Sequence, residues 1–284
     1  MSPCRGTRSL LFDIHGNLPA LDAVLDDARA RGADRWLLGG DYAVFGGWPA
    51  DTIARLRELH NATWIRGNVD RWAATQAPDF ELAQTGAASC REALDADTLS
   101  ALGALPESAD LGAGTRAWHA SPKSDMRSFW PQPAQDENEL LDAVRDSRLV
   151  FGHFHLAFER TSASGIELVG PGSVGIPMDG DHRAAYALLH DDGRIQRRRV
   201  PYNHAASAAR VRETAGAAWG ETIRPPDRAG HTLSQHGVRL ACFTLQRARS
   251  SDPWPWRPIS GHGTWRLSPA TTVVSNWDAS SRRE

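Results

Sequence analysis

The stretch SLLFDIHGN, residues 9–17, decides the fold, because it runs a short apolar segment directly into an acid and an imidazole. Its first residues are typical of a buried strand, and Asp13 and His15 follow where that strand would end. Residues 18–32 then carry apolar side chains at helical spacing, with a proline in the first turn and a glycine just past the end. A buried strand, a polar turn and an amphipathic helix predict a layered α/β fold.

The same alternation continues along the chain. Strands are predicted at 34–41 and 62–68, with a helix at 49–60 between them, and residues 79–102 have helical spacing. Strand candidates become denser after this point, which predicts a second sheet facing the first. They cover residues 115–120, 147–153, 165–170, 183–189 and 193–200, with one helix at about 135–146 between the first two. The predicted fold class is α/β (α+β layered), with two sheets and flanking helices.

Length and composition suit one large domain with an appendage. The chain has 284 residues, of which 41% are apolar and 23% charged, and its net charge of -2 provides no field that would attract nucleic acid or an anionic membrane. We therefore expect a small-molecule partner, with the oligomeric state left open. From about residue 226 the periodicity stops, so we assign 1–225 to the main domain and 226–284 to a C-terminal extension. An irregular extension is the favoured interpretation, and a small tryptophan-containing module is the alternative.

Cysteine usage and the N-terminal segment predict a reducing, cytoplasmic compartment. Cys4, Cys90 and Cys242 are far apart and odd in number, which predicts neither a disulfide framework nor a thiolate metal site. Only about five apolar residues precede Asp13, too few for the core of a secretory signal, and no apolar run approaches the roughly 18 residues that span a bilayer. We expect a cytoplasmic protein without a membrane partner.

Residues of the metal-ligand type recur at the ends of several predicted strands. Each one alone has an ordinary explanation, as a turn residue or as a hydrogen-bonded core histidine. Ligands gather at the carboxyl ends of strands in α/β sheets, so that together these residues predict a common site. Oxygen and imidazole ligands without thiolate favour divalent Mn, Fe, Ni, Co or Zn. The residues are Asp13, His15, Asp41, Asn68, Asp70, His119, His153 and His155.

The motifs FDIHGN, GGDYAVFGGWP, RGNVD, WHASP, GHFH and GPGSVG occur in this order between residues 12 and 175. The ordered set closely resembles the calcineurin-like metallophosphoesterases, particularly their compact bacterial and archaeal phosphodiesterase branch. The resemblance covers roughly residues 8–225. It implies a two-sheet β-sandwich flanked by helices and a dinuclear metal-dependent phosphodiesterase that acts on a small phosphate ester.

The resemblance also implies roles for individual residues. One metal would be held by Asp13, His15 and His155, the other by Asn68, His119 and His153, with Asp41 between them. A hydroxide bridging two divalent ions, manganese first among them, would attack phosphorus and break the P–O bond. The implied catalytic residues are Asp41, Asn68, Asp70 and His119.

One position departs from the family pattern. Many members carry a histidine after the motif asparagine, where it can protonate the leaving oxygen, and this chain has Val69 there. Loss of a general acid typically removes about 10²–10⁴ in rate for a poor leaving group. We therefore expect better activity on aryl or pyrophosphate-linked esters. Phe12, where the family often has serine, is expected to affect packing beneath the site.

Substrate contacts are predicted at two further places. GPGSVG, residues 170–175, formally matches a dinucleotide-binding pattern, but a proline and a new strand follow instead of a helix. Gly172 and Ser173 either shape a phosphate pocket or form a tight turn. Arg66 could bind phosphoryl oxygens, although an exposed surface arginine is the ordinary alternative.

Other functions remain open at this point. A protein phosphatase and a hydrolase of dinucleoside polyphosphates or cyclic nucleotides share the predicted chemistry. A non-catalytic scaffold with the same fold belongs to a different class. Such scaffolds tend to lose metal-ligand histidines, whereas all seven ligand positions here hold competent residues.

Overall fold

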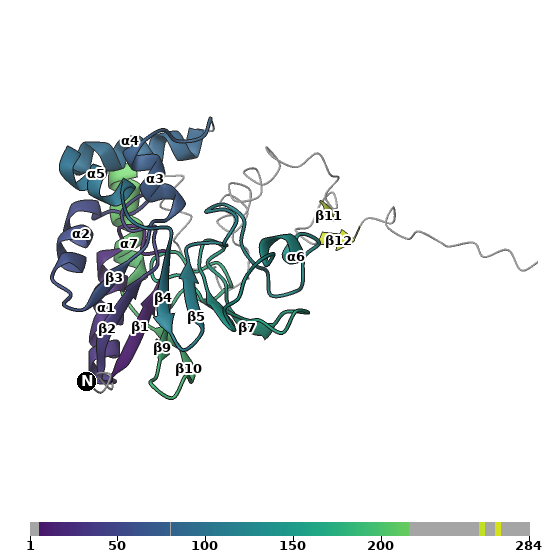
Figure 1. Ribbon diagram of the computed structural model, residues 1–284. Coiled ribbons are helices and arrows are strands. Elements are labelled where there is room, and N and C mark those ends of the chain that lie inside the picture. Colours follow the sequence, from purple (N-terminus) through teal and green to yellow (C-terminus); the bar gives the residue numbers. More distant parts are fainter. Residues whose placement is uncertain (1–5, 80, 216–255, 259–264, 268–284) are drawn as a thin grey trace, which may run out of the picture. The chain divides into compact units, whose positions relative to one another are not determined.

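The computed structural model describes residues 6–79, 81–215, 256–258 and 265–267 (Figure 1). The chain divides into two units, residues 1–246 and 247–284. The first unit holds two five-stranded sheets with helices, which confirms the predicted α/β fold class. The predicted boundary between residues 225 and 226 lies outside the described residues.

The first sheet has the strand order β10-β9-β1-β2-β3. Its three N-terminal strands are parallel, β9 runs antiparallel to β1, and β10 pairs antiparallel with β9 as a hairpin. Helices α1 and α2 make the crossovers between the parallel strands, as parallel strands require. The strands are β1 (Thr7–Leu11), β2 (Ala33–Leu38), β3 (Ala62–Trp64), β9 (Ala184–Leu189) and β10 (Ile195–Val200). The helices of this part are α1 (Leu18–Ala30), α2 (Pro49–Arg57), α3 (Asn68–Ala74), α4 (Glu81–Ala93), α5 (Ala96–Gly103) and α7 (His204–Ala215).

The second sheet has the order β4-β5-β6-β8-β7. Strands β5, β6 and β8 are parallel, and β4 and β7 close the two edges in the antiparallel sense. Figure 1 shows the short helix α6 beside this sheet, on the side away from α2, α4 and α5. The elements are β4 (Ser108–Gly112), β5 (Thr115–Trp118), α6 (Glu137–Leu140), β6 (Arg148–Val150), β7 (Ala157–Thr161) and β8 (Glu167–Pro171).

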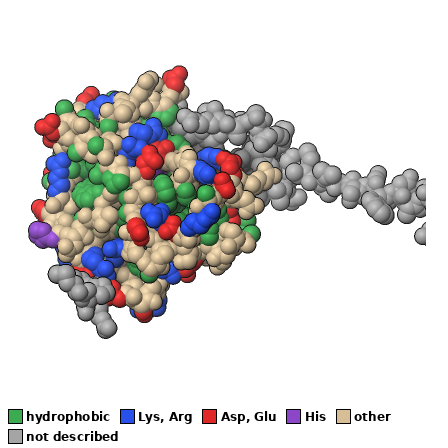
Figure 2. Space-filling view, viewed as in Figure 1, with side chains coloured by type: hydrophobic (Ala, Val, Ile, Leu, Met, Phe, Trp, Pro, Cys, Tyr) green, Lys and Arg blue, Asp and Glu red, His purple; other side chains and the backbone are tan. Residues whose placement is uncertain are grey.

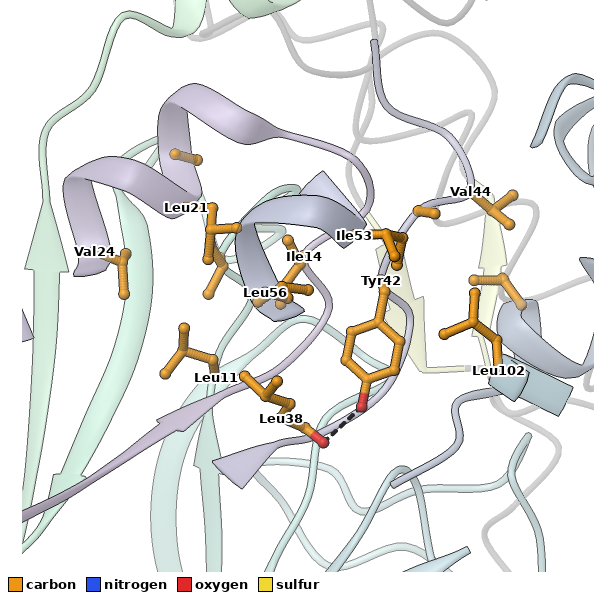
Figure 3. Close-up of a cluster of buried hydrophobic side chains, with 14 of the residues drawn as sticks. Leu11, Ile14, Leu21, Val24, Leu38, Tyr42, Val44, Ile53, Leu56 and Leu102 are labelled. Atoms are coloured by element: carbon orange, nitrogen blue, oxygen red, sulfur yellow. Dashed lines mark hydrogen bonds between the residues drawn. The ribbon is translucent and has the colours of Figure 1, made fainter. Parts of the chain in front are cut away.

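Side-chain alternation along the strands builds the layers. Leu10 and Leu37 of the first sheet belong to the same buried cluster as Val150 and Val169 of the second, so the two sheets share a core. Their sequence neighbours in the first sheet point to the opposite face and pack against the helices, as Figure 3 shows. The larger cluster there includes Leu11, Ile14, Leu21, Val24, Leu38, Tyr42, Ile53 and Leu56.

Tyr42 ties the ends of two parallel strands together within this cluster. Its ring is fully buried, and its hydroxyl lies 2.7 Å from the carbonyl oxygen of Leu38 and 2.6 Å from that of Ile65. A buried hydroxyl needs such partners, because leaving it unpaired would cost about 1–3 kcal/mol. Tyr42 therefore fixes the spacing of the strand ends from which polar side chains project.

Several elements differ from the sequence predictions. The helix predicted at 79–102 is two helices, since Asp95 accepts a hydrogen bond from the Thr98 amide at 2.6 Å and starts a new one. The predicted helix at about 135–146 is reduced to α6. Residues 65–68 leave the predicted strand, and α3, β4, β7 and α7 were not predicted. In the second unit, β11 (Trp256–Pro258) pairs antiparallel with β12 (Trp265–Leu267), which the interpretation of an irregular extension did not include.

Asn17 joins the start of α1 to two distant segments. Its side-chain amide donates to the Gly175 carbonyl at 2.8 Å and to the Tyr202 hydroxyl at 3.2 Å, and its oxygen accepts from Ser207 Oγ at 2.9 Å. Because Ser207 lies on α7, this helix is connected directly to the polar turn after β1.

The surface is mixed in charge. Figure 2 shows arginine and acidic side chains interspersed on one face of the molecule. Among the described residues, no helix combines the length and the apolar character needed to cross a membrane.

Candidate metal centre

Turns after β1, β2, β3, β5 and β6 bring seven buried side chains to one edge of the sandwich. Each of the seven residues is at most 5% exposed. Six of them form two groups of three whose ligand-type atoms lie within 4.8 Å of one another. The first group is Asp13, His15 and His155, and the second is Asp41, His119 and His153, with Asn68 beside it.

In the first group, the imidazoles of His15 and His155 face each other with their Nε2 atoms. His15 Nδ1 lies 3.0 Å from the Val44 carbonyl oxygen, and His155 Nδ1 lies 2.6 Å from that of Ile176. A carbonyl only accepts, so each Nδ1 carries the proton. Burial lowers the pKa of both histidines, which keeps them neutral. Their unprotonated Nε2 atoms therefore meet at 3.1 Å, a repulsive contact of two lone pairs that a shared cation would make favourable.

The second group also brings two hydrogen-bond acceptors together, at His153. Its Nε2 donates to the Met126 carbonyl at 3.0 Å, which leaves Nδ1 as an acceptor 2.9 Å from Asn68 Oδ1, another acceptor. Burial, together with His119, lowers the pKa of His153 to about 4, so protonation does not relieve the contact at neutral pH. Asn68 Oδ1 also lies 3.0 Å from His119 Nε2. This oxygen and the ring nitrogens converge as ligands of one cation would.

Asp41 lies between the two groups. Its Oδ2 is 3.3 Å from His119 Nε2 and 3.8 Å from His15 Nε2. Asp13 is likewise shared, since its Oδ1 is 3.7 Å from His155 Nε2 and 4.0 Å from His119 Nε2. The two groups form a single cluster, with Asp41 Oδ2 between His119 and His15.

The carboxylates of Asp41 and Asp70 contribute a negative electrostatic field at Asp13. Burial raises the pKa of Asp13 to about 8, and the nearby Asp41 and Asp70 act in the same direction, against the opposing effect of His119. Burial also opposes ionisation of Asp41, but its histidine neighbours, His119 first, hold the pKa of that carboxyl well below its usual range. Burial alone would lower the pKa of His119, yet Asp41 and Asp13 raise it to about 10. Such a field is satisfied by added positive charge.

The backbone of the cluster is in an uncommon conformation. Five of the seven residues, Asp13, His15, Asp41, His153 and His155, have φ between +51° and +71°. Asp13 and His15 follow the end of β1, and both lie in the left-handed region instead of continuing the extended strand. Such conformations cost on the order of 1–3 kcal/mol each, and they concentrate at functional sites.

Other predicted residues support the cluster from outside. Ser173 is fully buried, donates from Oγ to the Asp13 carbonyl oxygen at 2.7 Å, and accepts from the Ile176 amide. Gly172 has φ +86°, a turn conformation that suits glycine. Phe12 is buried between the sheets, as predicted. Asp70 is 1% exposed and bonds to backbone amides; burial, followed by Asp41, raises its pKa to about 6.

The side chains of Arg66 and Val69 have contacts outside the two groups. Arg66 donates to the Gly103 carbonyl at 2.9 Å and to Glu107 at 2.5 Å, contacts that hold the segment before β4. The Val69 side chain packs in the helix-side core. A role for Arg66, Gly172 or Ser173 in substrate binding stays a prediction.

Sequence reasoning missed the backbone oxygens that orient the imidazoles. They belong to Gly39, Val44, Met126 and Ile176, and each accepts from a histidine ring. Every residue has a carbonyl, so no side-chain pattern marks these four positions. The second ring nitrogen of a metal-binding histidine usually has such a partner, and this was the available indication that acceptors would be present.

Known proteins share this architecture. The calcineurin-like phosphoesterase superfamily domain matches residues 9–194. An uncharacterized protein of Methanocaldococcus jannaschii is 28% identical over 217 residues, which cover 69% of this chain and 87% of the relative.

Two solved structures are similar. A metallophosphoesterase from Sphaerobacter thermophilus is 26% identical with a TM-score of 0.63, covering 74% of this chain and 94% of its own. A hypothetical protein from Pyrococcus horikoshii OT3 is 19% identical with a TM-score of 0.67, covering 80% and 99% respectively, and supports the fold alone. With the family match extending over most of the first unit, the chain belongs to the calcineurin-like phosphoesterase superfamily.

Proposed function

We propose that this protein is a dinuclear metal-dependent phosphodiesterase that hydrolyses a P–O bond of a small phosphate ester. The observation that carries the proposal is the 3.1 Å contact between His15 Nε2 and His155 Nε2, whose rings are both fixed with Nδ1 toward a carbonyl. Two neutral imidazoles held with their lone pairs facing each other beside a buried carboxylate fit a divalent cation.

The residues present fit two ions. Asp13, His15 and His155 would hold one ion, and Asn68, His119 and His153 the other, with Asp41 Oδ2 between them. When bound, the ions would supply Lewis-acid charge and an activated water at neutral pH. Manganese is the proposed metal, with iron, nickel, cobalt and zinc as alternatives, because the donor set has oxygen and imidazole nitrogen without thiolate.

The chain's own residues orient the histidine rings of the site. Carbonyl contacts at Nδ1 hold His15, His119 and His155, so no ring has to turn to present Nε2. Val69 is buried and its side chain has no dissociable proton, so it cannot protonate the leaving oxygen. The proposal therefore includes a preference for aryl or pyrophosphate-linked esters, which leave without help. The cytoplasm is the proposed location.

A substrate panel with the full-length protein tests this proposal. Bis(4-nitrophenyl) phosphate, a dinucleoside polyphosphate, a cyclic nucleotide and a dialkyl phosphate would be compared with and without added Mn(II). We expect metal-dependent turnover and a difference of about 10²–10⁴ between aryl and alkyl esters. Equal rates on alkyl esters would contradict the leaving-group preference. Turnover that persists in the metal-free protein would contradict the mechanism, and no turnover with bound metal would favour a scaffold.

A further inference from the structure

We propose that Asp70 is a positioning residue of the metal centre, which holds the turn after β2 against the start of α3 so that Asp41 and Asn68 face the same ion. The proposal rests on the proposed function, because it assigns a role within that site. Asp70 is 1% exposed and belongs to neither group of ligand atoms.

The Asp70 carboxylate accepts hydrogen bonds from three backbone amides of two segments. Its Oδ2 accepts from the amides of Asp41 and Gly67, both at 2.8 Å, and its Oδ1 accepts from the Tyr42 amide at 3.0 Å. Hydrogen bonds to an ionised acceptor are roughly twice as strong as neutral ones. Because Asp41 and Tyr42 lie after β2 and Gly67 precedes α3, this one side chain joins the two turns.

The connection is reciprocal. The amide of Val69 donates to Asp41 Oδ1 at 3.0 Å, so each segment donates amides to the carboxylate of the other. With Oδ1 occupied in this way, Asp41 Oδ2 is the atom that faces His119 and His15. The orientation of the bridging carboxylate thus follows from contacts that Asp70 organises.

The two turns approach too closely for another side chain to do this. A Cβ on Gly40 would lie 2.6 Å from the Gly67 amide nitrogen and 2.7 Å from His119 Nδ1, and one on Gly67 would overlap Asp41. The two segments therefore need glycine at positions 40 and 67, where their backbones approach each other. Three converging amides need an acceptor with several lone pairs, which a carboxylate provides. The same bonds also hold Asp41 at φ +61°.

Substitution of Asp70 with asparagine tests the assignment. An amide of the same shape keeps one acceptor oxygen and turns an N–H₂ donor toward backbone N–H groups. We expect Mn(II) affinity, measured by calorimetric titration of the full chain, to fall about 10–100-fold at one or both sites, the range for residues that support metal ligands. The spin-coupled electron paramagnetic resonance signal of a manganese pair should weaken in parallel.

Two further variants separate position from charge. Glu137→Gln also neutralises a buried carboxylate, one that pairs with Arg160 away from the site, and should leave Mn(II) affinity within about twofold. Asp70→Glu keeps the charge but displaces it by one methylene, and should also weaken binding. If Asp70→Glu binds like the wild type, charge rather than position is the cause and the proposal is overturned. Should Asp70→Asn not fold, this glutamate variant decides the question.

The metal-affinity measurements test the role of Asp70 separately from the proposed hydrolysis. A wild-type chain that binds two ions and hydrolyses esters, with Asp70→Asn binding as tightly, would refute the role of Asp70 and leave the proposed function standing. A wild-type chain that binds two ions without hydrolysis would refute the function, and the affinities of the variants would still judge Asp70.

Discussion

Two clusters of charge in this protein are built in opposite ways. At the metal centre, Asp13 and Asp41 are buried with histidine rings 3.3–4.0 Å from their carboxylate oxygens. On α1, Asp27 accepts hydrogen bonds from Arg31, from Arg198 and from the Tyr186 hydroxyl at 2.6 Å. Burial would raise the pKa of Asp27, but these donors outweigh it and lower the pKa to about 2, whereas the pKa of Asp13 rises to about 8.

The difference teaches where a cation is needed. Asp27 has fixed guanidinium partners and needs nothing further. Asp13 has no such partner: its neighbouring imidazoles at His15 and His155 are neutral, and the His119 imidazole, 4.0 Å away, lies closer to Asp41, at 3.3 Å. A buried carboxylate without a permanent cationic partner is a functional-site indicator, and a carboxylate satisfied by arginines is a structural one.

Replacing Asp41 with asparagine should produce the largest effect. The change halves the acceptor capacity at the bridging position and removes its charge. We expect Mn(II) affinity to fall by more than the roughly 10–100-fold typical of supporting residues, with hydrolysis lost in parallel. Calorimetric titration measures this. Asp27→Asn is the matched control and should bind Mn(II) as the wild type does; an equal loss in both would erase the contrast between the clusters.

Gly40→Ala should come next. The new Cβ would meet the backbone of Gly67 and the ring of His119, at a residue with φ +95°. We expect a loss of several kcal/mol in unfolding free energy, since overpacking alone costs about 1–3 kcal/mol and the left-handed backbone adds to it. Urea denaturation measures the change. Gly32→Ala at the end of α1 has φ +79° and nothing within 4 Å of its Cβ, so it isolates the backbone contribution and should cost less.

Removing metal should have an intermediate effect on stability. Ions at 100 times their dissociation constant stabilise the folded state by about 2.7 kcal/mol per site. For a protein of this size that corresponds to a rise in Tm of roughly 5–10 °C per site, lost when a chelator is added. Thermal unfolding monitored by circular dichroism checks it. The Asp27→Asn variant should show the same chelator-dependent shift, and a Tm indifferent to chelator in the wild type would argue against metal in the cluster.

Asp27→Asn itself should have the smallest effect. The pKa of this carboxyl is lowered on folding, so its contribution to stability is fully present above pH about 4 and declines as pH falls toward about 2. We expect a loss of about 0.5–1.5 kcal/mol at pH 7, because the side chain is partly exposed. Denaturant titrations at pH 7, 4 and 3 should show the difference from wild type shrinking at pH 3. A difference that grows on acidification would mean that Asp27 is not stabilised as its contacts indicate.

Most of the layered fold was predictable because buried strands and amphipathic helices leave periodic apolar patterns. The convergence of polar residues at strand ends also follows from parallel topology. The directions in which these side chains point could not be predicted. They depend on left-handed backbone at Asp13 and His15, which no pattern of side-chain types indicates. The carbonyl of Met126 and the amides collected by Asp70 were equally hidden, because backbone groups are identical at every residue. Asp95 shows the opposite case, where a recognisable helix cap was overlooked.

The contacts of Asn17 have a consequence for shortened versions of this protein. The family match ends at residue 194, within the hairpin that leads to β10, whereas Tyr202 and Ser207 complete the hydrogen bonds of Asn17 from beyond that point. A chain cut at the edge of the family match would expose the turn that carries Asp13 and His15. The hydrogen-bonded surroundings of this turn are therefore longer in sequence than the segment by which the family is recognised, and they include Ser207 of α7.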